Sequence, residues 1–579
     1  MKRAIPGIIV GIAAVILCIW GFATGWVGES TSTKAGDLYE ILGLKDVNGN
    51  NLDKKYGAII LDDVLQESRE LYVDDKVYLP IEFISQSLNH RFYWDKHEKK
   101  LLYTLPSGTK IYKKNDKNIR IEEDGIYISQ DLISKYTDVT FQNFQAPTRV
   151  VITSDWGSKI QTAKTDSDTK LRQNASAKSD ILKDCVEGDE FHVLEKSGDW
   201  IKVVSEDGLT GYVKQDDMGE EKTIVLKSKN KIVDQTPTRV LSSNKRITLA
   251  WHAVYSMAGN STLSERVAQV DGLNVISPTW FAPNDKNGNI VSYASADYVA
   301  SAHQMGMEVW ALISDFDGST NKRYTDSILP YTSRRTNLVN NIVAELTASG
   351  ADGVNVDFEY VNSDIADDYL QFLRELTVAC HKKNKIVSVD NYVPSTWTKQ
   401  YNRAEEIASA DYLIIMGYDE HNNSSDSAGS VASLSFVKKG IEDTLAEVGE
   451  ENSNRVINAL PFYARLWSET PEQYAEGNAK IIEDEQKGSY ALSSKALSMD
   501  EAQQAVSTNG AKKTWDEESG QYYAQYQVDH TTYRIWMEDT KSLQKKLQCM
   551  SEYKLAGAAF WSLGFESSNV WDTIKKYNK

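Results

Sequence analysis

The sequence is poor in the residues that build disulfide frameworks and metal centres. Its 579 residues include only four cysteines and eight histidines. The cysteines, Cys18, Cys185, Cys380 and Cys549, lie far apart, so no spacing indicates a disulfide framework or a zinc site. The histidines form no H-x-x-x-H pattern. The sequence therefore predicts no metal centre and no cofactor.

Positive charge is also scarce. The chain has 64 lysines and arginines against 82 aspartates and glutamates, a formal net charge of −18. A protein that binds nucleic acid needs a basic face, so this balance argues against nucleic acid as a partner. The length exceeds that of an ordinary domain, and we expect several modules.

One long uncharged apolar run lies at the N-terminus. Residues 4–27 follow Lys2 and Arg3 and are numerous enough to cross a hydrocarbon layer of about 30 Å. A secretory signal has an apolar region of roughly 7–15 residues, so the run predicts an uncleaved transmembrane helix over residues 1–28. The basic pair would keep the N-terminus in the cytoplasm and place the rest of the chain outside the cell membrane. Cleavage at residues 23–25, Ala-Thr-Gly, is the alternative.

The most informative segment is 352–360, with the sequence DGVNVDFEY. Apolar residues alternate with Asn355, Asp357 and Glu359, which predicts a β-strand with one apolar and one polar face. Two acids at positions i and i+2 on one face repel each other and raise one pKa, an arrangement that suits general acid catalysis near neutral pH. A solvated strand edge is the alternative interpretation.

Three further segments follow this strand along the chain, and their order is informative. They are 416–421 (MGYDEH), 460–465 (LPFYAR) and 557–563 (GAAFWSL). Together with Asp352, Gly353, Asp357 and Glu359, they resemble glycoside hydrolase family 18, the chitinase-like enzymes, whose signature strand is D-G-x-D-x-D-x-E. The form of the strand is similar to the branch of spore-germination and cell-wall glycosidases. Asn355 stands where the family usually has Asp, so one charge is missing.

The chain from residue 246 to 579 contains the repeated pattern of a barrel. Eight apolar, β-rich runs occur at 247–252, 273–281, 308–315, 353–359, 386–392, 412–418, 456–463 and 557–563. Helix-like stretches such as 364–383 and 540–553 separate them, which predicts an α/β fold, a (β/α)8 barrel. The long gap before the last run predicts an inserted α+β region with hairpins. Its aromatic residues either stack on sugar rings or pack the hairpins.

The resemblance implies a catalytic role for three residues. Glu359 would protonate the departing glycosidic oxygen and then act as a base toward water. Asp357 would accept the N–H of the substrate's 2-acetamido group, and Tyr418 would donate to the acetamido oxygen. Because strands of such a barrel deliver catalytic groups from their C-terminal ends, these side chains can reach one mouth.

The resemblance also implies a substrate-binding set. Trp561 would stack under the reacting sugar, and Met416 and Asp419 would line the same subsite. Asn355 and Asp352 belong to this set as residues that support the strand rather than touch the sugar.

The implied activity is a glycosidase acting on polysaccharides of β-linked sugars with a 2-acetamido group, by retaining catalysis in which that group is the nucleophile. Peptidoglycan, including spore cortex, is favoured because of the modules described next. Chitin and its oligosaccharides are an alternative substrate. A non-catalytic glycan-binding scaffold on the same barrel is an alternative of another class, although such relatives typically lack the acid equivalent to Glu359.

Two small modules precede the barrel. Residues 36–155, with 71–80 (LYVDDKVYLP) and 91–95 (RFYWD), resemble the α+β stalk domain named for the N-terminal domain of copper amine oxidases, common on exported proteins of Gram-positive bacteria. No copper-ligand pattern occurs in them. Residues 158–218, with 199–203 (DWIKV), resemble a small all-β bacterial Src-homology-3-type barrel, which would hold the cell wall or serve as a spacer. Residues 219–245 predict a linker.

Overall fold

The computed structural model describes residues 31–317, 322–475, 480–484 and 488–578. It divides into two compact units, one formed by the chain up to Phe83 together with Lys117–Val233, the other by Ile84–Asp116 and Asp234–Lys579. The predicted membrane helix at 1–28 lies outside the described residues. Within them, no helix is both long enough and apolar enough to cross a bilayer.

The first unit contains two seven-stranded sheets and one shared core. One sheet has the order β7 (Ile119–Glu122), β8 (Gly125–Ser129), β3 (Lys76–Pro80), β2 (Val64–Val73), β1 (Tyr56–Leu61), β10 (Arg149–Thr153), β9 (Thr140–Phe144). The other has the order β13 (Ile181–Cys185), β12 (Thr169–Arg172), β16 (Thr210–Lys214), β15 (Trp200–Ser205), β14 (Glu190–Ser197), β11 (Lys159–Lys164), β17 (Lys222–Val225). Ala58 and Ile60 of the first sheet share a core with Leu171 and Val203 of the second.

The second unit is built on a closed barrel of parallel strands. In chain order they are β18 (Ile247–His252), β19 (Val275–Pro283), β21 (Glu308–Ser314), β24 (Gly353–Asp357), β25 (Ile386–Tyr392), β26 (Tyr412–Met416), β27 (Val456–Pro461) and β34 (Gly557–Trp561). The first strand pairs with both the second and the last, which closes the barrel. At the seam, a Cβ on Gly557 would lie 1.9 Å from the Ile247 carbonyl oxygen, so a side chain there is excluded. The predicted (β/α)8 barrel is confirmed.

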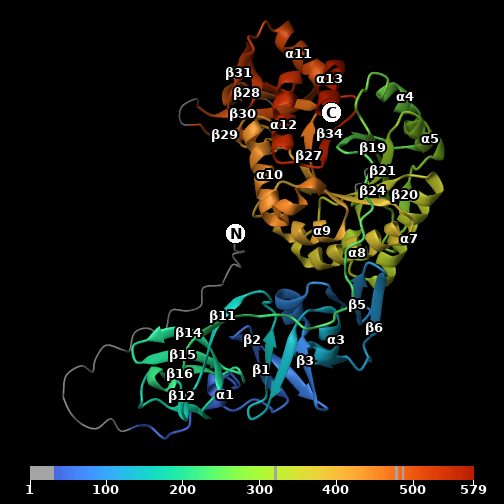
Figure 1. Ribbon diagram of the computed structural model, residues 1–579. Helices are drawn as coiled ribbons and strands as arrows, with labels where there is room; N and C mark the ends of the chain where they lie inside the picture. The colour runs from blue at the N-terminus through green and yellow to red at the C-terminus, as the bar shows by residue number, and fades with distance from the viewer. Residues whose placement is uncertain (1–30, 318–321, 476–479, 485–487, 579) are drawn as a thin grey trace. The chain divides into compact units, whose positions relative to one another are not determined.

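Helices surround the barrel in the second unit (Figure 1). They include α5 (Ala296–Gln304), α7 (Thr332–Ser349), α8 (Ala366–His381), α9 (Arg403–Ser409), α10 (Leu434–Val448), α12 (Thr540–Glu552) and α13 (Trp571–Tyr577). In α8, Tyr369, Leu373, Leu376 and Cys380 recur at helical spacing and are buried, which fixes the face that packs on the sheet.

The predicted insertion lies between β27 and β34. Its sheet has the order β29 (Lys480–Ile482), β30 (Tyr490–Ser498), β28 (Tyr463–Pro471), β33 (Thr531–Met537), β32 (Gln521–Val528), β31 (Thr514–Asp516), and α11 (Met499–Thr508) packs on it. Its aromatic rings pair with one another, as in Tyr523 with Trp536 and Tyr526 with Tyr533. These pairs support the packing interpretation of the hairpin aromatics.

A three-stranded hairpin sheet from the N-terminal half of the chain belongs to the barrel unit. It consists of β4 (Phe92–Asp95), β5 (Lys100–Leu105) and β6 (Gly108–Lys113). Asp95 accepts hydrogen bonds from the backbone N–H of Thr332 at 2.7 Å and from its hydroxyl at 2.5 Å, at the start of α7. The segment predicted to be a single stalk domain therefore contributes to both units.

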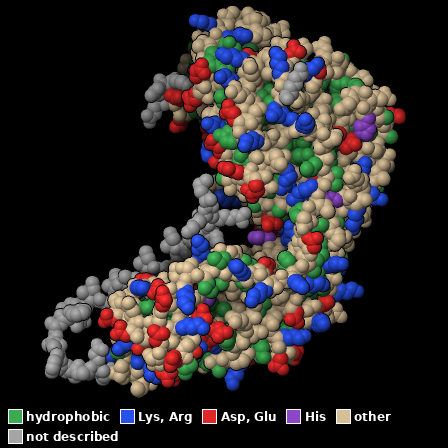
Figure 2. Space-filling view, in the orientation of Figure 1, with side chains coloured by type: hydrophobic (Ala, Val, Ile, Leu, Met, Phe, Trp, Pro, Cys, Tyr) green, Lys and Arg blue, Asp and Glu red, His purple; other side chains and the backbone are tan. Residues whose placement is uncertain are grey.

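Acidic and basic side chains are interspersed on the face drawn in Figure 2. Side chains of both signs occur on each of the two units on this face. A local excess of side chains with one sign of charge would stand out against this background.

Candidate active site

The carboxyl ends of the barrel strands surround a cavity of about 220 Å³. Six of the eight residues predicted to form the site line it: Asp357, Glu359, Met416, Tyr418, Asp419 and Trp561. They come from β24, β26 and β34 or the residues just after them. Four residues that the sequence analysis did not select also line it: Trp251, Asp390, Tyr392 and Tyr463.

A second cavity of about 490 Å³ shares three of these residues. Asp357, Glu359 and Trp561 line both cavities. The second one is walled mainly by aromatic side chains, among them Tyr255, Trp280, Phe281, Tyr293 and Phe316. Aromatic rings present flat apolar faces of the kind that stack on sugar rings. The two cavities together form a cleft that passes Glu359.

Asp357 is half-buried, and one of its carboxylate oxygens is buried. Its Oδ1 has no hydrogen-bond partner among the described residues. Burial raises the pKa of Asp357 well above its usual value, and the charges of Glu359, Asp390 and Asp315 raise it further. Such an oxygen can accept a hydrogen bond from a bound ligand.

Glu359 lies next to it on the cleft. Burial raises the pKa of Glu359, and Asp419 raises it further, while the hydrogen bond from the Tyr392 hydroxyl lowers it. That hydroxyl donates to Glu359 Oε2 at 2.5 Å. The balance is a raised pKa, which keeps a larger share of this carboxyl protonated near neutral pH than in water, as a general acid requires.

Asn355 lies in the centre of the barrel and does not line the cleft. Its Nδ2 donates to Asp390 Oδ1 at 2.7 Å and to Ser388 Oγ at 3.0 Å, and its Oδ1 accepts from Trp251 Nε1 at 2.9 Å. A carboxyl group thus lies beside position 355, on the next strand, at Asp390. Burial raises the pKa of Asp390, and Glu359 raises it further, against the lowering effect of Asn355.

Asp315, just after β21, is a second acid that the sequence analysis missed. Its Oδ2 accepts from the backbone N–H of Tyr360 at 2.7 Å, and its Oδ1 has no partner among the described residues. Burial raises the pKa of Asp315 to about 6, although the Tyr360 N–H lowers it and Glu359 raises it. It holds the chain directly after Glu359.

The segment that follows β26 positions Tyr418, the tyrosine of the predicted site. Burial raises the pKa of Tyr418 well above its usual value, so its hydroxyl stays protonated and can donate. A Cβ on Gly417 would lie 2.7 Å from the Asn458 side chain, so glycine allows the close turn. The Tyr463 hydroxyl donates to Asp419 Oδ1 at 2.6 Å and orients that carboxylate.

Asp352 lies at the other end of β24 and is not part of the cleft. Its Oδ2 accepts from the backbone N–H of Val309 and from His303 Nε2, both at 2.8 Å. Within the predicted substrate-binding set, Asp352 thus has the expected role of a residue that supports the strand and does not touch the cleft, because an acid that precedes a barrel strand lies at the opposite end from the catalytic mouth.

No group of three or more histidine, cysteine or acidic residues within the described ranges is arranged to hold a metal ion. The residues that line the cleft offer proton donors, proton acceptors and aromatic surfaces. It can protonate a leaving group, accept an N–H and support a sugar ring.

Comparisons with known proteins agree with this geometry. Residues 229–566 match the model described as glycosyl hydrolases family 18, and residues 167–218 match the bacterial SH3 domain. The uncharacterized glycosylase YvbX of Bacillus subtilis (strain 168) is 26% identical over 332 residues, which cover 53% of this chain and 85% of YvbX. The cortical fragment-lytic enzyme of the same strain is 24% identical over 242 residues, 40% of this chain and 51% of that protein.

One solved structure supports the fold. The C-terminal domain of a "putative chitinase" from Desulfitobacterium hafniense DCB-2 has a TM-score of 0.50 and 21% identity. The match covers 58% of this chain and 100% of that domain.

Proposed function

Because the chain belongs to the family 18 glycosyl hydrolases, we propose that this glycosidase hydrolyses peptidoglycan, spore cortex included, by retaining, substrate-assisted catalysis. The observation that carries the proposal is the shared cavity of Asp357, Glu359, Tyr418 and Trp561, with a buried oxygen on Asp357 that has no partner in the described part of the chain. Substrates are β-linked glycans whose reacting sugar bears a 2-acetamido group.

The first step breaks the glycosidic bond. The acetamido oxygen of the substrate attacks the anomeric carbon, and the carbon–oxygen bond to the leaving sugar breaks. Glu359 gives its proton to the departing oxygen. The Tyr392 hydroxyl holds the Glu359 carboxyl in place during this transfer. The products are a shortened glycan and a cyclic oxazolinium ion.

Asp357 and Tyr418 act on the acetamido group. Asp357 Oδ1 accepts the acetamido N–H, which orients the oxygen for attack and places negative charge beside the developing cation. The Tyr418 hydroxyl donates to the acetamido oxygen. Asp390 adds a second negative charge close to Asp357, held in position by Asn355. Glu359 then takes a proton from water as the ring opens with retained configuration.

The wall polymer is favoured over other acetamido glycans by two supporting facts. One relative is named a cortical fragment-lytic enzyme, and the chain carries a bacterial SH3 domain. In our proposal this domain holds the cell wall and keeps the cleft close to its polymer.

We also propose that residues 1–28 anchor the protein in the cell membrane with the barrel outside. The support is the uncharged run 4–27 behind two basic residues. Membrane fractionation of the producing cells, followed by protease treatment of wall-stripped cells, tests this. We expect to find the barrel in the membrane fraction, and we expect protease to digest it in wall-stripped cells. A barrel that is protected from protease would contradict the proposed orientation.

The activity is tested by incubating the purified protein with peptidoglycan and, separately, with chitin oligosaccharides. New reducing ends are then identified by mass spectrometry. We expect faster release from peptidoglycan, with an N-acetylated sugar at each new end. Faster release from chitin would reassign the substrate, and tight glycan binding without any new ends would make the protein a scaffold.

A further inference from the structure

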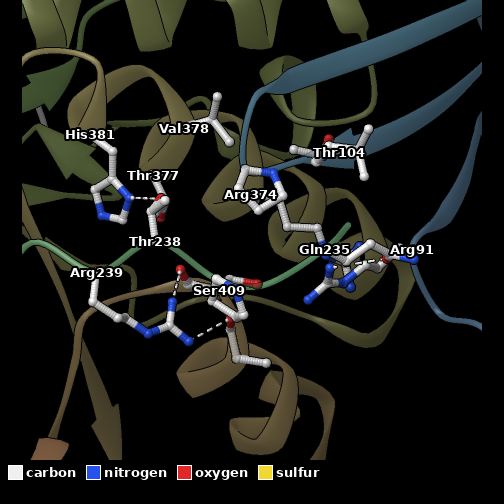
Figure 3. Close-up of a pocket in the computed structure, with 14 residues that line it drawn as sticks. Arg91, Thr104, Gln235, Thr238, Arg239, Arg374, Thr377, Val378, His381 and Ser409 are labelled. Atoms are coloured by element: carbon white, nitrogen blue, oxygen red, sulfur yellow. Dashed lines mark hydrogen bonds between the residues drawn. The ribbon is translucent and has the colours of Figure 1, made fainter. Parts of the chain in front are cut away.

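A small cavity lies at the opposite end of the barrel from the cleft. Its volume is about 50 Å³. Four segments distant in the sequence meet around it: the hairpin of β4–β6 with the residue before it, residues 235–239, the C-terminal part of α8 and the C-terminal part of α9. Figure 3 shows Arg91 beside Gln235 on one side and Arg239 beside Ser409 on the other.

The lining of this cavity is basic. Arg91, Arg239, Arg374 and His381 all line it, and none of its lining residues is an aspartate or a glutamate. Carboxylates lie behind it, where Glu405 pairs with Arg374 and Asp411 pairs with His381, both at 2.9 Å. This excess of positive charge stands out in a chain with a net charge of −18.

Two of the arginines have no carboxylate partner among the described residues. Arg239 donates to the backbone carbonyl groups of Ala408 and Ser409 at the end of α9, at 3.0 and 3.4 Å. Arg91 donates to the side chain of Gln235 at 3.4 Å. Burial lowers the pKa of Arg239 and of Arg374; Asp411 raises the first and Glu405 the second, and the nearby charge of Arg91 lowers both. An anion between these groups would relieve the repulsion.

Two buried polar atoms on α8 also lack partners. Arg374 Nε and Thr377 Oγ1 have no hydrogen-bond partner among the described residues. Their residues are only 6% and 5% exposed, and they lie one helical turn apart on the cavity wall. Both atoms can donate a hydrogen bond. Leaving such donors buried without an acceptor is costly, and both residues line the cavity.

We propose that this cavity binds a phosphate group. Its volume of about 50 Å³ suits one small oxyanion. Guanidinium groups bind phosphate oxygens through paired, charge-assisted hydrogen bonds. Because the ligands come from the hairpin, the segment 235–239 and α8, bound phosphate ties these three parts together at the end of the barrel away from the cleft.

The probe is inorganic phosphate, titrated into the purified full chain in detergent by calorimetry at constant ionic strength, with chloride as the reference anion. We expect saturable binding by the wild type and binding about tenfold weaker in Arg91→Gln, since one charge-assisted contact is lost. Lys110→Gln is the matched control: it removes one positive charge from the exposed face of the same hairpin and should change the affinity less than twofold.

A second variant covers the case in which Arg91→Gln disturbs docking of the hairpin. Thr377→Val removes one buried hydroxyl, keeps every charge, and should also weaken phosphate binding. The proposal is overturned if phosphate produces no saturable signal, if chloride matches it, or if both variants bind as the wild type does.

Two further ligands distinguish the sources of the phosphate group. Methyl phosphate and dimethyl phosphate are titrated in the same way. Binding of either supports a phosphate group carried by a larger molecule, whereas binding of inorganic phosphate alone supports the free ion.

Discussion

At the N-terminal ends of the barrel strands, acidic side chains are satisfied. Asp352 accepts from Val309 N–H and His303, and Asp411 accepts from Val387 N–H and His381, all between 2.8 and 2.9 Å. At the carboxyl ends, Asp357 and Asp315 each keep a buried oxygen without a partner among the described residues. The same segment, 352–360, supplies an acid to each end.

This difference in hydrogen bonding distinguishes acidic residues that stabilise the fold from acidic residues that serve catalysis. A carboxylate that accepts two hydrogen bonds stabilises the strand ends that it joins. A buried carboxylate oxygen without a partner costs stability, and the pKa of its carboxyl group is raised, as in Asp357 and Asp315. Such a cost is typical of catalytic sites, where the missing partner is the substrate. Four variants test this contrast.

Glu359→Gln should have the largest effect. The amide keeps the shape of the side chain but has no acidic proton to give, so kcat should fall by about 10³-fold or more. Binding of an uncleaved glycan should change little. Steady-state kinetics on peptidoglycan fragments and calorimetric titration with the glycan provide the two measurements. Cleavage at the wild-type rate would remove Glu359 from the mechanism.

Asp390→Asn should lower kcat by about tenfold to a hundredfold while KM changes little, because one negative charge near the developing cation is lost. Asp357 must be ionised to stabilise that cation, and Asp390 raises its pKa. The variant should therefore move the acidic limb of the kcat profile to lower pH. A lower rate with an unmoved limb would assign Asp390 to packing alone.

Asp315→Asn should stabilise the protein at neutral pH. The pKa of Asp315 rises from 3.8 in the unfolded reference to about 6 in the fold, so the folded state binds the extra proton between these values. The wild type therefore loses stability as pH rises from 4 to 6, whereas the amide does not titrate. At pH 7.5 we expect a gain on the order of 2 kcal/mol in the free energy of unfolding, which vanishes near pH 3.5. Urea unfolding at both values checks this, and an equal difference at both would contradict it.

Asp352→Asn should have the smallest effect and is the control for the others. It makes the same change from carboxylate to amide at the N-terminal end of the strand, where the carboxylate has its hydrogen-bond partners. We expect kcat within about twofold of the wild type and a loss of about 1 kcal/mol in the free energy of unfolding, since one charge-assisted contact with His303 weakens. A large fall in kcat would break the contrast between the two ends.

The sequence predicted the barrel and the core of its cleft because both depend on local patterns. Alternation within a strand decides which face a side chain occupies, and parallel strands end at one mouth, so Asp357, Glu359 and Tyr418 could be placed together. Asp390 was missed although it lies in a predicted strand, 386–392. The role of Asp390 depends on its hydrogen bond with Asn355, which joins β25 to β24. No pattern within one strand reveals that contact.

The sequence also did not reveal which segments far apart in the chain pack against each other. The hairpin of β4–β6 joins the barrel unit through contacts such as Asp95 with Thr332, whose partners lie far apart in the chain. Neither residue has a sequence signal for the other. The same holds for the basic cavity, which four separate segments enclose.

The most direct test of substrate assistance compares kcat/KM for one peptidoglycan fragment before and after removal of its N-acetyl groups. If the acetamido oxygen is the nucleophile and Asp357 only its partner, the deacetylated fragment should be cleaved at least about 10³-fold more slowly, because the attacking atom is absent. No sugar ester should form on the enzyme. Equal cleavage of both fragments, or an ester trapped on Asp357, would contradict the account.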